Sequence, residues 1–302
     1  MLSKFRLLAL CPILFGSLLA VAQKPLGENA WKAVEDAIGR SGQAQADGAY
    51  KFSFPRGDLK VKVGDVDVKP ALALGGWVAF SKPDKNSMMM GDLVLAEDEI
   101  APVMGSLQDS GVEITALHNH ILNESPRVMY MHIGGHGDAA KLAAAVKQAM
   151  ALTKAPAPTP PANPPQDLGI DTAAIEQALG QKGKVNGGVF QISVSRNEIR
   201  EGGDIIQGAP KIPSSMGLAT ALNFQPTGGG KAAITGDFVL IGKEVNPVIQ
   251  ALRSNGIQVT ALHSHMLDEQ PRLFFMHFWA NDDAVKLAKG LRAALDKTNS
   301  KK

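Results

Sequence analysis

The sequence predicts an α+β fold of two tandem homologous domains, each a mainly antiparallel sheet with helices over one face. Residues 91–132 and 236–277 align without a gap at a constant offset of 145, and the similarity continues into a helical tail in each copy. A proline-rich segment, 155–166, separates the copies. Strands, a helix, a hairpin and a second helix follow one another in both copies, which is the element order of an α+β domain.

The opening part of each copy has a short amphipathic segment and then alternates between apolar and polar residues. This pattern predicts a helix followed by strands. The expected elements are helices around 31–39 and 171–179 and strands around 50–54, 190–194, 59–63, 76–80 and 88–95. The gap-free alignment begins inside the last of these strands, at Gly91-Asp92 and Gly236-Asp237.

Two further helices are expected in each copy, on either side of a hairpin. The helix before the hairpin covers about 97–110 in the first copy and 243–255 in the second, and it is ended by Gly111 or Gly256. The helix after the hairpin begins near Asp138 or Asp283. Glycine after a helix can adopt the left-handed conformation that ends it, and aspartate before a helix accepts hydrogen bonds from its first backbone N–H groups. The aspartates are therefore interpreted as N-caps.

The ends of the copies define the expected domain boundaries. The first 22 residues have a basic start at Lys4 and Arg6, an apolar run and Ala20-Val21-Ala22 before Gln23, a pattern typical of a cleavable secretory signal. We therefore expect an exported protein, periplasmic or extracellular, with no stable membrane insertion after cleavage. The expected parts are a signal peptide at 1–22, a first repeat at 23–152, a linker at 153–167 and a second repeat at 168–302.

Charge and cysteine content exclude several classes of function. The only cysteine, Cys11, lies in the expected signal, so the mature chain would have neither a disulfide nor a thiolate ligand. The chain has 31 basic and 29 acidic residues, and loss of Lys4 and Arg6 balances them. A neutral chain lacks the basic footprint of a nucleic-acid-binding protein, so no nucleic-acid partner is expected.

The proline-rich linker favours an extended polyproline conformation. At about 3.1 Å per residue, the stretch 155–166 can span roughly 35–40 Å. That length allows the two repeats to pack on each other in several orientations, including a pseudo-twofold pair.

All seven histidines lie in the two hairpin segments or just beyond them. They are His118, His120, His132, His136, His263, His265 and His277. Residues two apart on a strand share a face, so the first two histidines of each copy point the same way. A hairpin that pairs His118 with His132 would place their Cβ atoms about 5 Å apart. A register shifted by one residue would turn His132 to the opposite face.

Three converging imidazoles and a carboxylate are a suitable ligand set for zinc, copper, iron or manganese. One divalent-metal site per repeat is predicted, with His136 as an optional extra ligand in the first. The metal ligands are His118, His120 and His132 in the first repeat and His263, His265 and His277 in the second. Glu124 and Glu269, at the turns, would be either a fourth ligand or a catalytic general base acting on metal-bound water.

Arg127 and Arg272 follow a proline directly after each turn. A guanidinium near a metal can bind a carboxylate or phosphate with two hydrogen bonds, which makes these arginines candidate substrate-binding residues for a small anionic ligand. Alternatively, each arginine pairs with the glutamate of its own turn and braces it. The apolar residues at 129–131 and 274–276 are expected to pack in a core, with soft Cu(I) ligation as the alternative.

Two family resemblances accompany these motifs. The block HNHxxxExPRxxxxH from His118, its recurrence and the preceding GD-x-VL strand resemble the LppY/LpqO family of exported bacterial proteins, over nearly the whole mature chain. That resemblance implies membership of a family without an assigned mechanism. The spacing HxHxxxE also resembles the first metal motif of cupins, which places His118, His120 and Glu124, or His263, His265 and Glu269, at ligand positions and implies a β-barrel.

Three functional hypotheses remain open on the sequence alone. The first is an exported divalent-metal-binding protein, or beyond that a metal-dependent enzyme acting on a small anionic substrate, with one histidine-rich site per repeat. The second is a metal-free binding module for an anionic partner. The third is a cupin-like metal enzyme.

Overall fold

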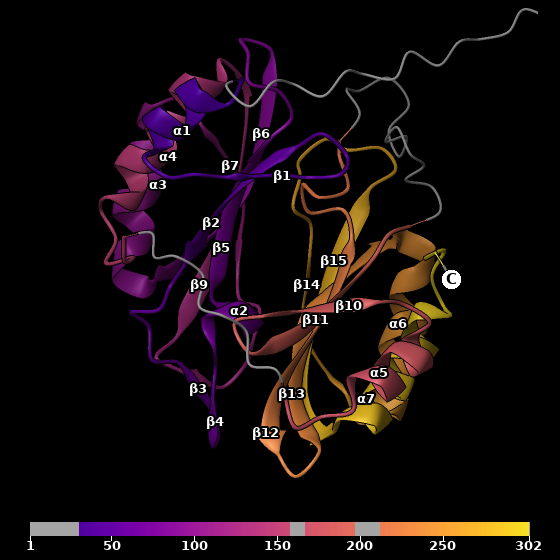
Figure 1. Ribbon diagram of the computed structural model, residues 1–302. Coiled ribbons are helices and arrows are strands. Elements are labelled where there is room, and N and C mark those ends of the chain that lie inside the picture. The colour runs from indigo at the N-terminus through magenta and orange to yellow at the C-terminus, as the bar shows by residue number, and fades with distance from the viewer. Residues whose placement is uncertain (1–29, 158–166, 197–211, 302) are drawn as a thin grey trace, which may run out of the picture.

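The computed structural model describes residues 30–157, 167–196 and 212–301. The expected signal peptide and most of the proline-rich linker lie outside the described residues. The predicted α+β architecture of two tandem domains, each with a mainly antiparallel sheet, is confirmed. Figure 1 shows most helices on two outer sides of the molecule and the two sheets facing each other between them, with the short helix Pro70–Ala73 near the middle.

The first repeat contains a six-stranded main sheet and a small three-stranded sheet. Its helices are α1 (Lys32–Ile38), α2 (Pro70–Ala73), α3 (Ile100–Asp109) and α4 (Ala139–Met150). Its main-sheet strands are β1 (Gln43–Ala44), β2 (Tyr50–Pro55), β5 (Gly75–Phe80), β6 (Ser87–Ala96), β7 (Glu113–His118) and β9 (Val128–Gly137), in the order β1-β2-β5-β6-β9-β7. The small sheet consists of β3 (Lys62–Val63), β4 (Val66–Asp67) and β8 (Glu124–Ser125). The strand expected at 59–63 is therefore shorter and outside the main sheet.

The second repeat has the same strand order in its main sheet. Its helices are α5 (Thr172–Leu179), α6 (Gly242–Ser254) and α7 (Ala284–Leu295). Its strands are β10 (Gly183–Asn186), β11 (Val189–Val194), β12 (Thr220–Gly228), β13 (Lys231–Ile241), β14 (Gln258–His263) and β15 (Leu273–Asp283), in the order β10-β11-β12-β13-β15-β14. Both sheets are open, with β1 and β7 or β10 and β14 at their edges, so they differ from the barrel that a cupin would have.

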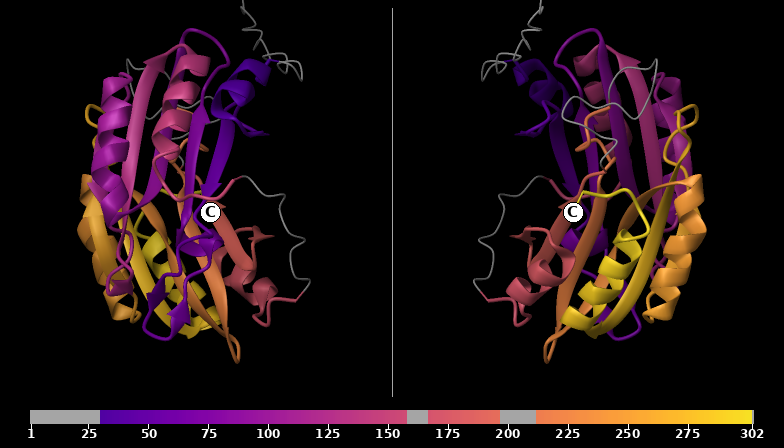
Figure 2. Two further views of the ribbon diagram at one scale, coloured as in Figure 1. Left: turned by 90° about the vertical axis from the view of Figure 1, so that its left-hand side faces the viewer. Right: turned by 90° about the vertical axis from the view of Figure 1, so that its right-hand side faces the viewer.

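Each sheet buries its outer face under its own helices. In the first repeat Val34 of α1, Leu107 of α3 and Val146 of α4 pack in one core with Leu93 of β6 and Met131 of β9. Successive residues of a strand point to opposite faces, so the neighbours of these core residues face the other repeat. The two views of Figure 2 show the helices lying along the outer faces of both sheets.

The predicted helix ends are confirmed. Oδ1 of Asp138 accepts hydrogen bonds from the backbone N–H groups of Ala140 and Lys141, and Oδ1 of Asp283 accepts one from Lys286. Gly111 and Gly256 have φ values of 76° and 70°, the left-handed region in which a glycine is favoured. No helix among the described residues combines the length and apolar character needed to cross a membrane.

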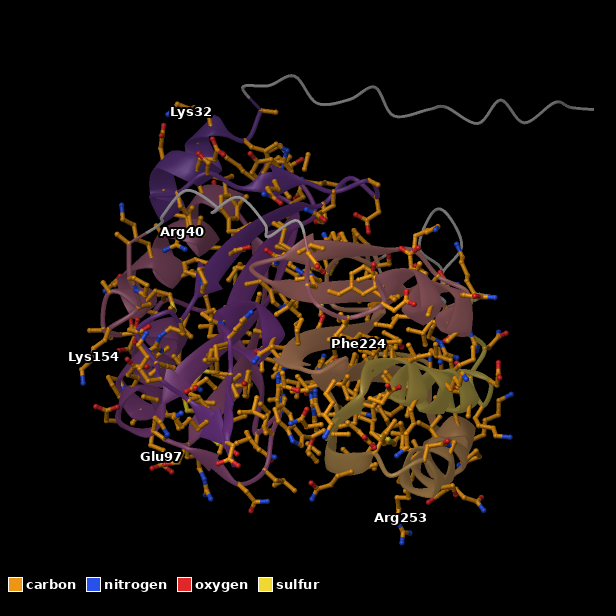
Figure 3. The ribbon with its side chains drawn as sticks, turned by 60° about the horizontal axis from the view of Figure 1, so that its bottom comes forward. Lys32, Arg40, Glu97, Lys154, Phe224 and Arg253 are labelled. Carbon is orange, nitrogen blue, oxygen red and sulfur yellow. The ribbon has the colours of Figure 1, made fainter. Side chains whose placement is uncertain are left out.

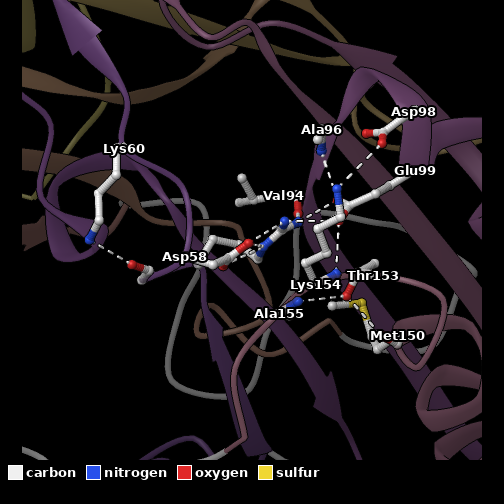
Figure 4. Close-up of polar contacts among 12 residues, drawn as sticks. Asp58, Lys60, Val94, Ala96, Asp98, Glu99, Met150, Thr153, Lys154 and Ala155 are labelled. Carbon is white, nitrogen blue, oxygen red and sulfur yellow. Dashed lines mark hydrogen bonds and ion pairs between the residues drawn. The ribbon is translucent and has the colours of Figure 1, made fainter.

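A buried arginine–glutamate pair ties the helix start to the sheet in each repeat. Nη1 of Arg56 lies 2.6 Å from Oε2 of Glu99 and donates to the carbonyl of Val94 at 2.7 Å. The pair Arg196 and Glu244 repeats this arrangement at 2.7 Å. Figure 4 shows Glu99 between Ala96 and Lys154, whose backbone N–H groups both donate to its carboxylate. The pair therefore fixes where β6 ends and α3 begins.

The facing surfaces of the two sheets contact each other directly. Val94 and Tyr130 of the first repeat share an apolar cluster with Ala233 of the second. Nδ2 of Asn119 donates to the carbonyl of Thr260 at 3.1 Å, across the two edge strands. Figure 3 shows side chains filling the space between the repeats, whereas Glu97, Lys154 and Arg253 lie on the outside.

Candidate metal centre

The hairpin register of the first repeat brings an aspartate and a histidine together. In the main sheet β9 lies between β6 and β7, and His132 on β9 is opposite Asp92 on β6. On the other side β7 pairs His118 with Tyr130, so His132 lies opposite Ala116. The predicted pairing of His118 with His132 is wrong by two residues, because the connection between the paired strands is two residues shorter than predicted; a bulge between Ile114 and Ala116 shifts the register by one more residue farther along β7.

A shift of two residues leaves the histidines on the same face, because side chains alternate with a period of two. The rings of His118 and His132 are stacked with their centroids 5.0 Å apart. His120 lies just beyond the end of β7, and its ring stacks on Tyr130 at 3.3 Å. The three imidazoles of the first repeat therefore converge as predicted, although through a different register.

The second repeat builds the same arrangement from β13, β14 and β15. His277 lies opposite Asp237 on one side and Ala261 on the other. His263 is at the end of β14, and the ring of His265, just beyond it, stacks on Phe275 at 3.5 Å. Equivalent residues thus occupy equivalent places in both sheets.

The histidines of the two repeats form a single cluster, so the two predicted ligand sets lie in direct contact. Each ring of one repeat stacks on a ring of the other. The centroid distances are 3.4 Å for His118 and His263, 3.7 Å for His120 and His277, and 3.6 Å for His132 and His265. The first pair joins equivalent residues of the two repeats. When each residue of the second pair is replaced by its equivalent in the other repeat, the third pair results. This is the contact pattern of an isologous, pseudo-twofold interface.

Asp92 and Asp237 are site residues that the sequence analysis did not assign. Oδ2 of Asp92 is 3.7 Å from Nε2 of His120, and its Oδ1 is 3.8 Å from Nε2 of His132. Asp237 is placed in the same way, 3.8 Å from His265 and 4.0 Å from His277. Their signal was present in the sequence, because both are in the gap-free repeat on strands that precede the hairpin.

The polar atoms of this cluster are buried without hydrogen-bond partners. Among the described residues, the Nε2 atoms of all six histidines have no partner, and neither does Oδ1 of either aspartate. Nδ1 of His277 is 2.8 Å from the carbonyl of Gly236, and Nδ1 of His118 is 3.0 Å from the carbonyl of Asn119. If these nitrogens carry the proton, the Nε2 lone pairs remain available to a ligand.

Burial keeps the histidines neutral. Desolvation lowers the pKa of His118 to about 4 and that of His263 to about 3. Burial, together with the neighbouring imidazoles, holds the pKa of the other four well below the usual value; these are His120, His132, His265 and His277. Neutral imidazole is the form that binds a metal.

Burial has the opposite effect on the carboxyl groups. Desolvation raises the pKa of Asp92 to about 7, and the positive charge of Lys51 partly offsets this increase. The pKa of Asp237 is raised well above its ordinary value by burial and by the negative charge of Asp92. The two carboxylates are therefore close enough to repel each other, and a cation between them would relieve the repulsion.

The ligand atoms are spaced for metal binding. One set, drawn from the first repeat alone, has its ligand atoms within 4.8 Å of one another: His118, His120 and His132. A second set, with the same limit, combines one histidine of the first repeat with three of the second: His118, His263, His265 and His277. All six histidines predicted as ligands thus belong to groups that can hold a metal ion, and one group spans both repeats.

The predicted glutamates and arginines lie at the turns. Glu269 is buried and accepts hydrogen bonds from the backbone N–H of Leu273 at 2.9 Å and from Arg272 at 3.3 Å. In the second repeat the arginine therefore braces its own turn. Glu124 forms part of β8, which pairs with β3, and Arg127 is exposed. The catalytic role of the glutamates and the substrate-binding role of the arginines stay predictions. His136, the optional extra ligand, is exposed on β9 and outside both histidine groups.

One cation lies on the face that the histidines share. Lys51 of β2 has its Nζ atom 4.0 Å above the ring of Trp77, and Trp77 is opposite Asp92 in the sheet. The Lys51 amine donates to the carbonyl of Ser215 in the second repeat at 3.3 Å. Burial lowers the pKa of Lys51 to about 8. An isolated lysine in a strand carries no sequence signal for this position.

The apolar residues around the hairpin strands divide between two roles. Met131 and Met276 pack in the cores under the helices, as expected. Tyr130 and Phe275 face the other way and stack on His120 and His265. The aromatic rings thus form part of the wall of the cluster.

Comparisons with known proteins identify the repeat unit. A family model described as Domain of Unknown Function (DUF1259) matches residues 32–152 and again residues 173–297. No curated protein matches the chain. Two solved structures show some likeness, both with a TM-score of 0.20, which is too low to bear on fold or function. One is PduB, a trimeric bacterial microcompartment shell protein, at 14% identity over 84% of this chain and 90% of that chain. The other is EtuB from Clostridium kluyveri, at 11% identity over 85% and 91%.

Proposed function

The chain belongs to the DUF1259 family, as two tandem copies of its domain, and from the geometry of its histidine cluster we propose that it binds divalent transition-metal ions between those copies. One observation carries this proposal. Six imidazole nitrogens and two carboxylate oxygens, all buried, converge without hydrogen-bond partners among the described residues. A buried polar group without a partner lowers the free energy of unfolding by about 1–3 kcal/mol. Eight such atoms in one cluster therefore indicate a ligand that accepts their lone pairs.

The donor atoms favour a particular class of metal. Imidazole and carboxylate ligands without thiolate suit zinc, iron, manganese and copper(II) better than copper(I). The histidines supply neutral nitrogen donors, and the aspartates supply the negative charge that neutralises the cation. A bound ion would lie where it can contact Asp92 or Asp237 together with the histidines 3.7 to 4.0 Å from each.

An enzymatic form of the proposal is a metal-dependent reaction on a small anionic substrate. Its support is Lys51, a half-buried cation on the same sheet face as Asp92. In this form Lys51 attracts the anion and the metal polarises it. Arg127 is a second candidate for the anion, whereas Arg272 already pairs with Glu269. Glu124 and Glu269 are the proposed bases.

We further propose that this binding occurs outside the cytoplasm, on the strength of the signal pattern at 1–22. Amino-terminal sequencing of the protein recovered from periplasmic and culture fractions tests this point. A mature chain that starts at Gln23 is expected, and an intact Met1 in the cytoplasmic fraction would contradict export.

Metal analysis of the untagged mature protein tests the binding proposal. We expect stoichiometric transition metal after supplementation and its loss in the double variant His118→Ala/His120→Ala. The matched control is His136→Ala, a histidine on β9 that is exposed and outside the cluster. Metal-free wild-type protein after supplementation, or equal metal in the double variant, would favour the metal-free binding module instead.

A further inference from the structure

We propose that the centre holds two metal ions side by side, one for each repeat's set of three imidazoles and one aspartate. This inference rests on the proposed function and adds the number and arrangement of the ions. The first set consists of Asp92, His118, His120 and His132, and the second of Asp237, His263, His265 and His277.

The number of donor atoms argues against a single ion. Divalent zinc takes about four ligands and the other candidate metals up to about six. The cluster offers six imidazoles and two carboxylates, whose inward atoms have no other partner among the described residues. A single ion on the pseudo-twofold axis would leave at least two buried donors unsatisfied. Two ions with four protein ligands each would use them all.

In each set the aspartate lies near two of the three histidines. Ligand atoms about 2.0–2.1 Å from a tetrahedral ion lie about 3.4 Å from one another. The separations between the carboxylate oxygens and the imidazole nitrogens are 3.7 and 3.8 Å in the first set and 3.8 and 4.0 Å in the second. Small side-chain movements would bring either set onto a bound ion.

The two ions would be neighbours because the sets interpenetrate. His118 of the first set has its ligand atom within 4.8 Å of those of all three histidines of the second. Its ring also stacks on that of His263 at 3.4 Å. Two divalent ions against two carboxylates leave a net positive centre. Its expected further ligand is a hydroxide or small oxyanion that bridges the ions, since two-metal sites of this kind hold such groups between them.

A zinc titration of the metal-free mature protein, followed by metal analysis after gel filtration, tests the stoichiometry. We expect two equivalents of Zn²⁺ in the wild-type protein. The half-site variants Asp92→Ala/His132→Ala and Asp237→Ala/His277→Ala should each keep one, and the control His136→Ala should keep two. Circular dichroism checks that the half-site variants fold. The milder pair His132→Gln and His277→Gln repeats the measurement if either double variant does not fold.

Electron paramagnetic resonance of the protein loaded with Cu²⁺ tests the proximity. Two neighbouring Cu²⁺ ions should produce a half-field line from their coupling, and each half-site variant should lose it. One equivalent in the wild-type protein, or two equivalents without a half-field line, would overturn the two-ion inference and leave the proposed function intact. No bound metal at all would overturn both.

Discussion

The two repeats agree in their ligands and differ in what surrounds them. Asp92 and His132 have exact counterparts in Asp237 and His277, in the same strands and the same register. The residues two strands away have diverged. Lys51 of the first repeat is replaced by Gln191 in the second, as the strand pairing shows. The centre is therefore nearly symmetric in the atoms that can bind a metal and asymmetric in its charge.

This difference places the positive charge of Lys51 in the first repeat's half of the centre. Lys51 donates to Ser215 across the repeats and lies over Trp77, whereas Gln191 donates to the carbonyl of Ala71 at 2.8 Å. The first carboxylate therefore has a cation nearby, whose charge partly offsets the rise in the pKa of Asp92. Any anionic ligand should approach the first repeat's half of the centre. Four measurements can sharpen or break this comparison.

The largest expected effect is the loss of stability of the metal-free protein in acid. Each buried histidine has a folded pKa below its ordinary 6.5, so the unfolded chain binds more protons and stability falls as pH falls below 6.5. The aspartates act in the opposite direction, because their raised pKa makes the folded chain lose stability as pH rises above about 4, up to about pH 7 for Asp92. Six histidines outweigh two aspartates, each contributing up to about 1.4 kcal/mol per pH unit.

Thermal unfolding in the presence of a chelator, between pH 7 and pH 5, measures this loss. His132→Gln and His277→Gln should reduce the pH dependence by equal amounts, because each removes one buried histidine from one repeat. Unequal reductions in the pH dependence would show that the two ligand sets are not equivalent. A melting temperature that is constant over this range would contradict the neutral state of the cluster.

The next effect concerns the buried ion pairs. Glu99→Leu and Glu244→Leu each leave a buried arginine without its main carboxylate and should cost about 3–5 kcal/mol of unfolding free energy. In the first repeat Arg56 keeps an ion pair with Asp58 at 2.8 Å, so its charge stays partly compensated. Urea denaturation of both variants compares the losses. A loss below about 1 kcal/mol in either would show that the pair does not hold that repeat together.

Substitution of the glycine before each aspartate should have unequal effects. A Cβ atom on Gly236 would lie 1.8 Å from the carbonyl oxygen of Ala221, whereas one on Gly91 would lie 2.9 Å from that of Trp77. Gly236→Ala is therefore expected to cost about 3 kcal/mol and Gly91→Ala about 1 kcal/mol. Metal analysis of both variants adds a second measurement, with the greater loss expected for Gly236→Ala. The reverse order of stabilities would mean that the strands β12 and β13 separate easily.

The smallest effect comes from making the two halves alike. Lys51→Gln removes the cation beside Asp92, so the pKa of that carboxyl should rise further, but the same cation repels a divalent ion more strongly than a proton. We expect zinc affinity at pH 6.5 to rise by less than about tenfold, and the gain to shrink at pH 9, because the pKa of Lys51 is about 8 and its amine is then largely neutral. Isothermal titration calorimetry at both pH values measures it. Gln191→Lys, the reciprocal variant, should weaken binding at pH 6.5, and a strengthening there would contradict the charge argument.

Much of this protein was determined by local sequence. The helix ends depend on neighbouring residues, so they could be predicted. The caps at Asp138 and Asp283 and the ends at Gly111 and Gly256 are confirmed. The same holds for the shared face of the histidines, because the alternation of a strand survives a shift of two residues.

Only the tertiary structure decided that two predicted sites are one centre. The packing of the repeats brings His118 against His263, although 145 residues of chain separate them, and no local pattern records that contact. Strand order likewise places Asp92 and Asp237 in the centre, since β6 pairs with β9, and β13 with β15, only once the sheets form. The residue types were in the sequence. Their assembly depends on long-range burial, which gathers polar groups that are far apart along the chain.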